Sequence, residues 1–158
     1  MGQSTDAILA YGYDLGEGLQ NIREAGEYGE LPPLSWLDEN GDEDLADAVE
    51  RRLLAEVIGF TETWSSGNEG YFGREREAKA RLGVEIQTYC SESCPMYVLA
   101  AHVIRVSRGD AEMLHPRSLA DQPDLEGWDE KLRVALEALG ITPTQERAQW
   151  LLCSYWGC

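Results

Sequence analysis

The chain has 158 residues, of which 43% are hydrophobic, and this is enough to bury the core of one domain. It contains no apolar run near the roughly 20 residues that span a bilayer, and its first residues lack the basic and apolar regions of a secretory signal peptide. We therefore expect a single cytoplasmic domain over residues 1–158, with its four cysteines reduced.

The formal net charge is −16, and most of it lies in the first third of the chain. Residues 1–50 hold 13 acidic side chains and a single basic one, Arg23. Such a surface repels nucleic acid and anionic membranes and attracts a basic partner. We expect a protein partner of basic character and no direct binding of nucleic acid or membrane. A face that only confers solubility is the alternative.

The first third of the chain predicts one strand and one irregular segment. The apolar side chains of residues 5–13 divide between the two alternating faces of a strand. Gly12 marks a bulge or a close backbone approach. The face formed by Ile8, Ala10 and Gly12 is small, so a helix could lie close against it. Residues 14–42 lack a clear period and contain several glycines and two adjacent prolines, which predicts an irregular acidic segment.

Two helices are predicted next. Over residues 43–58, apolar side chains recur every fourth position, with Asp42 as the expected N-cap and Gly59 as the stop. Residues 74–82 predict a shorter charged helix ending at Gly83. The connection between them is rich in glycine and carries four aromatic side chains: Phe60, Trp64, Tyr71 and Phe72.

The most apolar stretch, Val84 to Ser107, predicts two strands joined by a tight loop. Residues 84–90 begin with alternating apolar and polar side chains, whereas both alternating sets of residues 96–107 are mostly apolar. A strand covered on both faces has this pattern, so we expect it to be central in its sheet. A buried helix is the competing interpretation, but the β-branched content favours a strand.

The last third predicts a loop, a helix and a final strand. Pro116 and Pro123 favour a loop over residues 108–124. Residues 125–139 predict a helix whose buried stripe includes Leu125 and Trp128, and residues 149–156 predict a strand, with a continuing helix as the alternative. The expected fold class is therefore α+β: one domain with a mixed or antiparallel sheet of about four strands, packed by two main helices.

The cysteines are the residues most open to a chemical role. They form two closely spaced pairs, and thiolates in such pairs bind structural zinc if the terminal strand lies beside the hairpin. The metal-binding alternative uses Cys90, Cys94, Cys153 and Cys158. In the competing interpretation, Cys90 and Cys153 are small core residues. No catalytic residue and no cofactor are predicted, because His102 reads as a core histidine without an orienting carboxylate.

Three stretches carry a resemblance to a known group. They are Ser4 to Leu15, Gly83-Val84-Glu85 leading through Tyr89-Cys90 to Pro95-Met96, and Trp150 to Gly157. In these stretches the chain resembles a group of small acidic proteins from actinobacteria and their bacteriophages. The resemblance implies a bacterial cytosol or a phage-infected cell as the setting and favours a terminal strand. It implies no activity and no catalytic residues.

These observations favour a non-enzymatic protein-binding module of phage or mobile-element type that acts through an acidic surface and exposed aromatic side chains. The first alternative is an acidic DNA mimic that blocks a nucleic-acid-binding protein. The second is a small enzyme or zinc-binding protein that uses the loop between Cys90 and Cys94. The residues predicted to bind the partner are Asp38, Glu39, Asp42, Glu43, Asp44 and Asp47.

Overall fold

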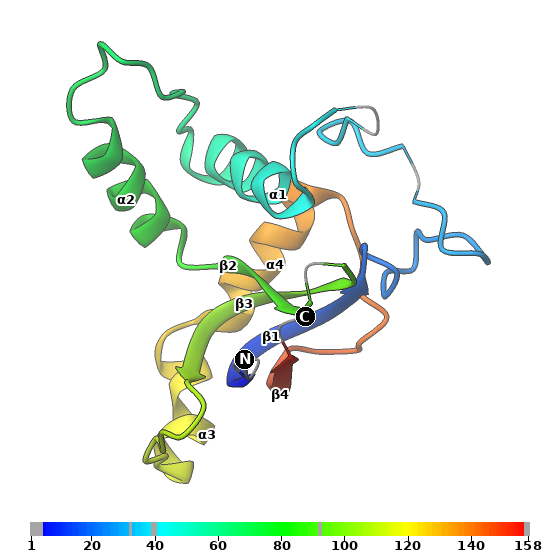
Figure 1. The fold of residues 1–158 in the computed structure, drawn as a ribbon, viewed down its shortest axis with the longest axis vertical. Helices are drawn as coiled ribbons and strands as arrows, with labels where there is room; N and C mark the ends of the chain where they lie inside the picture. The colour runs from blue at the N-terminus through cyan, green and yellow to red at the C-terminus, as the bar shows by residue number, and fades with distance from the viewer. Residues whose placement is uncertain (1–4, 32, 39–40, 92, 157–158) are drawn as a thin grey trace.

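A single antiparallel sheet organises the chain (Figure 1). The computed structural model describes residues 5–31, 33–38, 41–91 and 93–156. Within them, four strands pair in the order β2-β3-β1-β4, which confirms the α+β class. The strands are β1 (Thr5–Glu17), β2 (Glu85–Cys90), β3 (Pro95–Val106) and β4 (Gln149–Trp156).

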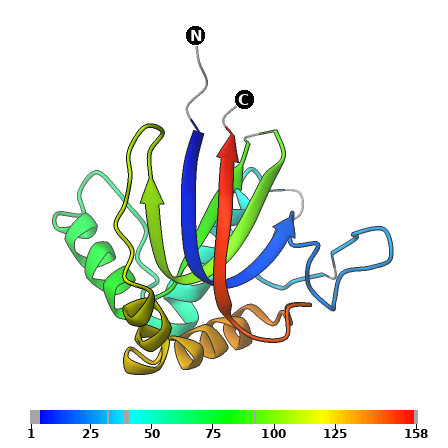
Figure 2. The same ribbon diagram turned by 90° about the horizontal axis from the view of Figure 1, so that it is seen from below.

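The helices gather on one side of this sheet, and the strands curve away from them (Figure 2). Helix α1 (Leu45–Leu53) continues into a π-helical turn, η1 (Leu54–Ile58), and α2 (Tyr71–Leu82) follows after a loop. Helices α3 (Pro116–Leu125) and α4 (Trp128–Leu139) precede the last strand. None of the helices in the described residues has the length and apolar character needed to cross a membrane.

The larger core lies between the helices and the sheet. Side chains of β1 and β3 meet α1, α2 and α4 there, and Leu15, Leu99 and Leu132 are fully buried. Trp36, from the irregular segment, closes one end of this core, and its indole Nε1–H donates a hydrogen bond to the Leu139 carbonyl at 2.8 Å. The segment before α1 is thus anchored on the end of α4.

A second, smaller core lies on the opposite face of the sheet. Ile8, Ala10, Val98, Ala100 and Cys153 are at most 8% exposed there, and their neighbours come from the strands themselves. The curvature of the sheet brings the strands over this face. β3 is therefore buried on both faces, as predicted, and it lies between β2 and β1.

Several sequence expectations are confirmed. The hairpin of β2 and β3 matches the two predicted strands, and the terminal segment is the strand β4 rather than a helix. The pairing register of β1 and β3 shifts between Tyr11 and Gly12, as expected for a bulge at that glycine. Gly59 ends the helical segment in the left-handed conformation, with φ of 80°.

Other expectations are wrong. The predicted loop over 108–124 contains α3, because Pro116 takes the first helical position, where its missing N–H costs nothing. Leu125 ends α3 and is 79% exposed, so it does not belong to the buried stripe of α4. The helices pack on the face of Tyr11 and not on the small face of Ile8 and Ala10.

The start of α1 and the end of the first strand also differ. Asp44, and not Asp42, takes the N-cap position, although its side chain makes no capping hydrogen bond. β1 runs four residues beyond its predicted end, to Glu17, so the irregular segment begins later than residue 14.

Candidate functional site

A groove of about 450 Å³ lies between α1–η1 and the segment that leads into α2. This volume falls in the range of small-ligand and side-chain pockets. We call it the acidic groove. Its lining residues are Asp47, Glu50, Arg51, Leu54, Ala55, Phe60, Thr61, Glu62, Thr63, Trp64, Tyr71 and Glu75.

A tight turn after η1 creates the groove. The Gly59 N–H donates to the Ala55 carbonyl at 3.1 Å, and the Phe60 N–H donates to the Leu54 carbonyl at 2.9 Å. Each bond spans one residue more than its counterpart in a Schellman motif, as follows from the π-helical turn before it, and Gly59 supplies the left-handed residue that ends the helix. The chain reverses there, and the Phe60 ring packs 6.0 Å from the Tyr71 ring, between centroids.

Arg74 of α2 holds the far wall of the groove in place. Its guanidinium bonds to the Glu62 carboxylate at 2.8 Å, to the Glu69 carbonyl at 3.0 Å and to Asn68 Oδ1 at 2.5 Å. The hydrogen bond from Arg74 holds the pKa of Glu62 below its usual value. The pair is exposed and adds little stability, but it fixes the path of the chain on both sides of Trp64.

Trp64 gives the groove an exposed aromatic surface. Its side chain is 61% exposed, whereas Leu54 and Tyr71 beneath the groove are buried. Tryptophan combines a large apolar surface with an N–H donor, and it is enriched where proteins meet other proteins. Phe72 is also exposed, at 63%, and packs edge-on against Tyr71, but it does not line the groove.

Four carboxylates surround this apolar floor, from Asp47, Glu50, Glu62 and Glu75. The Lys79 ammonium lies 2.8 Å from a Glu50 oxygen and 3.2 Å from a Glu75 oxygen, so two carboxylates share one cation.

The ionisation of this shared site follows from its contacts. A hydrogen bond from the Tyr71 hydroxyl, assisted by Lys79, holds the pKa of Glu75 below its usual value against the effect of desolvation. Desolvation lowers the pKa of Lys79, but the bonds to Glu50 and Glu75 outweigh it and raise the pKa. Glu75 and Lys79 are therefore both charged at neutral pH.

The groove keeps an excess of negative charge after these pairs are counted. Arg51 is neutralised by Glu43 at 2.9 Å, and Arg74 neutralises Glu62. Among the described residues, Asp47 has no ion-pair or hydrogen-bond partner. One negative charge remains on Asp47 and one on the two carboxylates around Lys79, so the groove attracts a cation.

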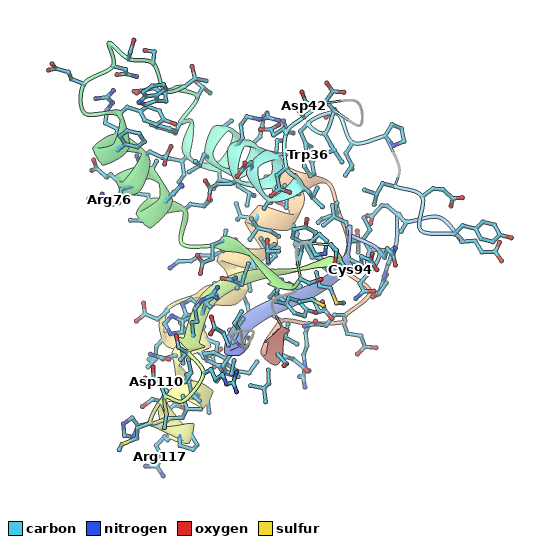
Figure 3. The ribbon with its side chains drawn as sticks, in the orientation of Figure 1. Trp36, Asp42, Arg76, Cys94, Asp110 and Arg117 are labelled. Atoms are coloured by element: carbon cyan, nitrogen blue, oxygen red, sulfur yellow. The ribbon has the colours of Figure 1, made fainter. Side chains whose placement is uncertain are left out.

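The acidic residues predicted to bind a partner lead into this groove. Asp38, Asp42, Glu43, Asp44 and Asp47 are all exposed, and Glu39 lies outside the described residues. Asp47 lines the groove itself. Asp42 lies just before the N-terminal end of α1 (Figure 3). The predicted residues therefore extend from the end of the groove along the start of α1.

Sequence reasoning missed the carboxylates of Glu50, Glu62 and Glu75. Acidic residues are so frequent in this chain that nothing in the sequence separates these three from the rest. The one usable signal is Trp64, a large aromatic residue in a polar, glycine-rich stretch, which is unusual for a surface loop.

The cysteines do not form a metal site in the described part of the chain. Cys90 is half-buried at the end of β2, Cys94 is exposed at the hairpin turn (Figure 3) and Cys153 is buried, with all three thiols free. No three histidine, cysteine or acidic side chains of the described residues are placed to hold a metal ion. Cys158, the fourth predicted ligand, lies outside those residues.

His102, predicted to be a core histidine, is half-buried on β3 and packs among aromatic side chains. Its ring stacks on Trp128 with centroids 5.2 Å apart and meets the Trp150 edge at 6.2 Å. Cys90 pairs with Pro95, which lies seven residues before His102 on β3, or roughly 20 Å at the usual rise of a strand. The thiol and the imidazole of the alternative enzyme site do not meet.

Comparison of the chain with family models, with curated proteins and with solved structures finds no match.

Proposed function

We propose that this protein is a non-enzymatic binding module that holds a basic segment of a partner protein in the acidic groove. The observation that carries the proposal is the combination of an exposed Trp64, an apolar floor and unneutralised carboxylates in one groove. Apolar contact supplies binding energy, and the negative potential speeds association and selects a cationic partner.

The acidic start of α1 extends this surface beyond the groove. Asp42 and Asp44 are exposed and continue the negative potential from Asp47 along the chain. A partner segment longer than the groove would meet these carboxylates next. Following the resemblance to actinobacterial and phage proteins, we place this function in the bacterial cytoplasm and count the protein among phage or mobile-element modules.

A DNA mimic is less well supported. Such a protein needs unpaired carboxylates spaced like phosphates along one face. Here the glutamates around α1 and α2 alternate with arginine and lysine, and Glu43, Glu50, Glu56 and Glu62 are all engaged in ion pairs. Pairing of this kind shortens the reach of the field that a DNA-binding protein would respond to.

The proposal is tested by a comparative pull-down from bacterial cytosol. The wild-type protein and the double variant Asp47→Asn, Trp64→Ala are immobilised at equal density, and the captured proteins are identified. We expect a basic protein that binds the wild type, is lost from the variant and elutes as salt is raised. Capture of the same proteins by both, or of acidic proteins only, would contradict the proposal. Asp121→Asn on α3 serves as the control, since it removes an exposed helical carboxylate far from the groove.

A further inference from the structure

We propose that the acidic groove recognises one arginine side chain of its partner, with the guanidinium against the Trp64 indole and bound by the Asp47 carboxylate. This inference rests on the proposed function and names the chemical group that the groove selects. Lys79 reduces the charge that the groove offers to this arginine, because its ammonium already pairs with the carboxylates of Glu50 and Glu75.

The aromatic surface favours a guanidinium over an ammonium. Arginine is planar and weakly hydrated, so it stacks on an indole face while its N–H groups bond to a carboxylate in the same plane. Trp64 offers an exposed ring, and Asp47 offers a carboxylate without a partner among the described residues. A lysine ammonium satisfies the charge of Asp47 but loses more hydration against the ring.

The groove's own ion pairs show why Asp47 is the contact residue. Glu62 is held by both the Nε and Nη2 atoms of Arg74, so an incoming cation would have to break a two-point contact. Glu50 and Glu75 each share Lys79 and keep only part of their charge available. Asp47 presents a full charge at no such cost, with the Glu50–Lys79–Glu75 cluster adding a residual negative potential behind it.

Substitution of Lys79, whose ammonium is shared by Glu50 and Glu75, provides a variant that should strengthen binding. Replacing Lys79 by glutamine frees the carboxylates of Glu50 and Glu75 and raises the negative charge of the groove by one. An arginine-binding groove should then bind more tightly. If Lys79 only supports the fold, the same change should weaken binding or leave it unchanged.

The experiment titrates full-length protein with three blocked peptides of glycine and serine that each carry two arginines, two lysines or two citrullines. The Trp64 indole N–H resonance, assigned with Trp64→Phe, reports binding in the groove. We expect the arginine peptide to bind about two- to fivefold more tightly than the lysine peptide, the range that a cation–π contact supports. The citrulline peptide, which is uncharged, should not shift the resonance.

Matched variants locate the site. Asp47→Asn should weaken the arginine peptide about two- to fivefold, the usual effect of one exposed charge pair, and Lys79→Gln should tighten it by a similar factor. Trp64→Ala should weaken it, as read from the backbone resonances of the groove. The controls Asp121→Asn, Lys131→Gln and Phe72→Ala should leave it unchanged, with unfolding midpoints confirming that every variant is folded.

The outcomes separate the two proposals. Equal affinity for the lysine and arginine peptides, or no effect of Asp47→Asn and Trp64→Ala, overturns the arginine site while binding of basic peptides still supports the proposed function. Spermidine binding as tightly as the arginine peptide also overturns it, in favour of a site for free polyamines. If no basic peptide binds the folded protein, the proposed function fails together with the arginine site.

Discussion

Gly12 lies where the backbones of β1 and β3 come close together. A Cβ atom built at this residue would lie 1.8 Å from the Leu99 carbonyl oxygen and 2.9 Å from the Ala100 Cα. Both contacts are to the backbone of β3, and Leu99 and Ala100 are fully buried. The neighbour therefore cannot move aside as a flexible side chain would, and the bulge at Gly12 depends on the missing Cβ.

Gly12→Ala should therefore destabilise the protein severely. Overpacking a core costs about 1–3 kcal/mol, occasionally more, and a clash between an added Cβ and a buried backbone belongs at or above the top of that range. The free energy of unfolding, measured in urea, should fall by about 3 kcal/mol or more. Gly67→Ala is the control, because no atom lies within 4 Å of its added Cβ, and it should change stability by less than about 0.5 kcal/mol. A loss of that small size in Gly12→Ala would contradict the close approach of β1 and β3 at this residue.

Helix α3 contains a proline and is supported by a side chain of the last strand, β4. Pro123 lies inside α3 and has no N–H for the Leu119 carbonyl, four residues earlier. The indole Nε1–H of Trp150, in β4, donates to that carbonyl at 2.8 Å instead. A side chain of the last strand thus replaces the missing helical hydrogen bond.

Because the Trp150 indole replaces the missing N–H of Pro123, the effects of mutating Trp150 and Pro123 on stability should be coupled. Trp150→Phe should cost about 1–3 kcal/mol, since it leaves the Leu119 carbonyl without a partner. In a Pro123→Ala background the backbone N–H of residue 123 can bond to that carbonyl, so the same change should cost less. A double-mutant cycle from urea unfolding measures the difference. Strict additivity of the two changes would show that the indole does not serve as the replacement donor.

The same elements show what the sequence can predict. The alternation of side chains between two faces locates β3 and the hairpin, and apolar residues at every fourth position locate α1. Each pattern follows from the period of one element. The prediction fails at α3 because prolines usually break helices. One of the two prolines starts this helix, and the other is tolerated only through Trp150, a contact across 31 residues that no local pattern reveals.

The groove is even harder to predict from local sequence patterns than α3. Its walls come from α1–η1, from the segment around Trp64 and from the start of α2, and they face each other only because the chain reverses at Gly59. The acidic run that ends at Asp47 is visible in the sequence. Which other carboxylates join it, and which are neutralised by Arg51, Arg74 or Lys79, depends on tertiary contacts.

For the molecule as a whole, the curved sheet buries tyrosines in both cores. Burial raises the pKa of Tyr11, Tyr13, Tyr89 and Tyr97, since the phenolate would lose its hydration. Nearby carboxylates add to the effect. The Tyr11 hydroxyl donates to Asp129 at 2.7 Å and the Tyr89 hydroxyl donates to Asp14 at 3.1 Å, so ionisation would place two negative charges together.

These tyrosines predict alkaline unfolding. The folded protein keeps their protons above pH 10, where the unfolded chain begins to release them, so the unfolded state binds fewer protons and stability falls as pH rises. Stability should be complete below the usual tyrosine pKa and should fall above it by about 1.4 kcal/mol per pH unit for each tyrosine that stays protonated. Urea midpoints measured across this range, with tyrosinate absorbance recorded in parallel, should show ionisation and unfolding occurring together.

Tyr11→Phe tests whether the buried tyrosines cause the loss of stability at alkaline pH, because it removes one of their titrating hydroxyls. The variant should lose some stability at neutral pH with the bond to Asp129, yet its stability should decline less steeply above pH 10, by about 1.4 kcal/mol per pH unit. Tyr28→Phe, at a side chain that is 86% exposed, is the matched control and should keep the wild-type slope. If both variants keep that slope, the alkaline transition does not come from the tyrosines buried against the sheet.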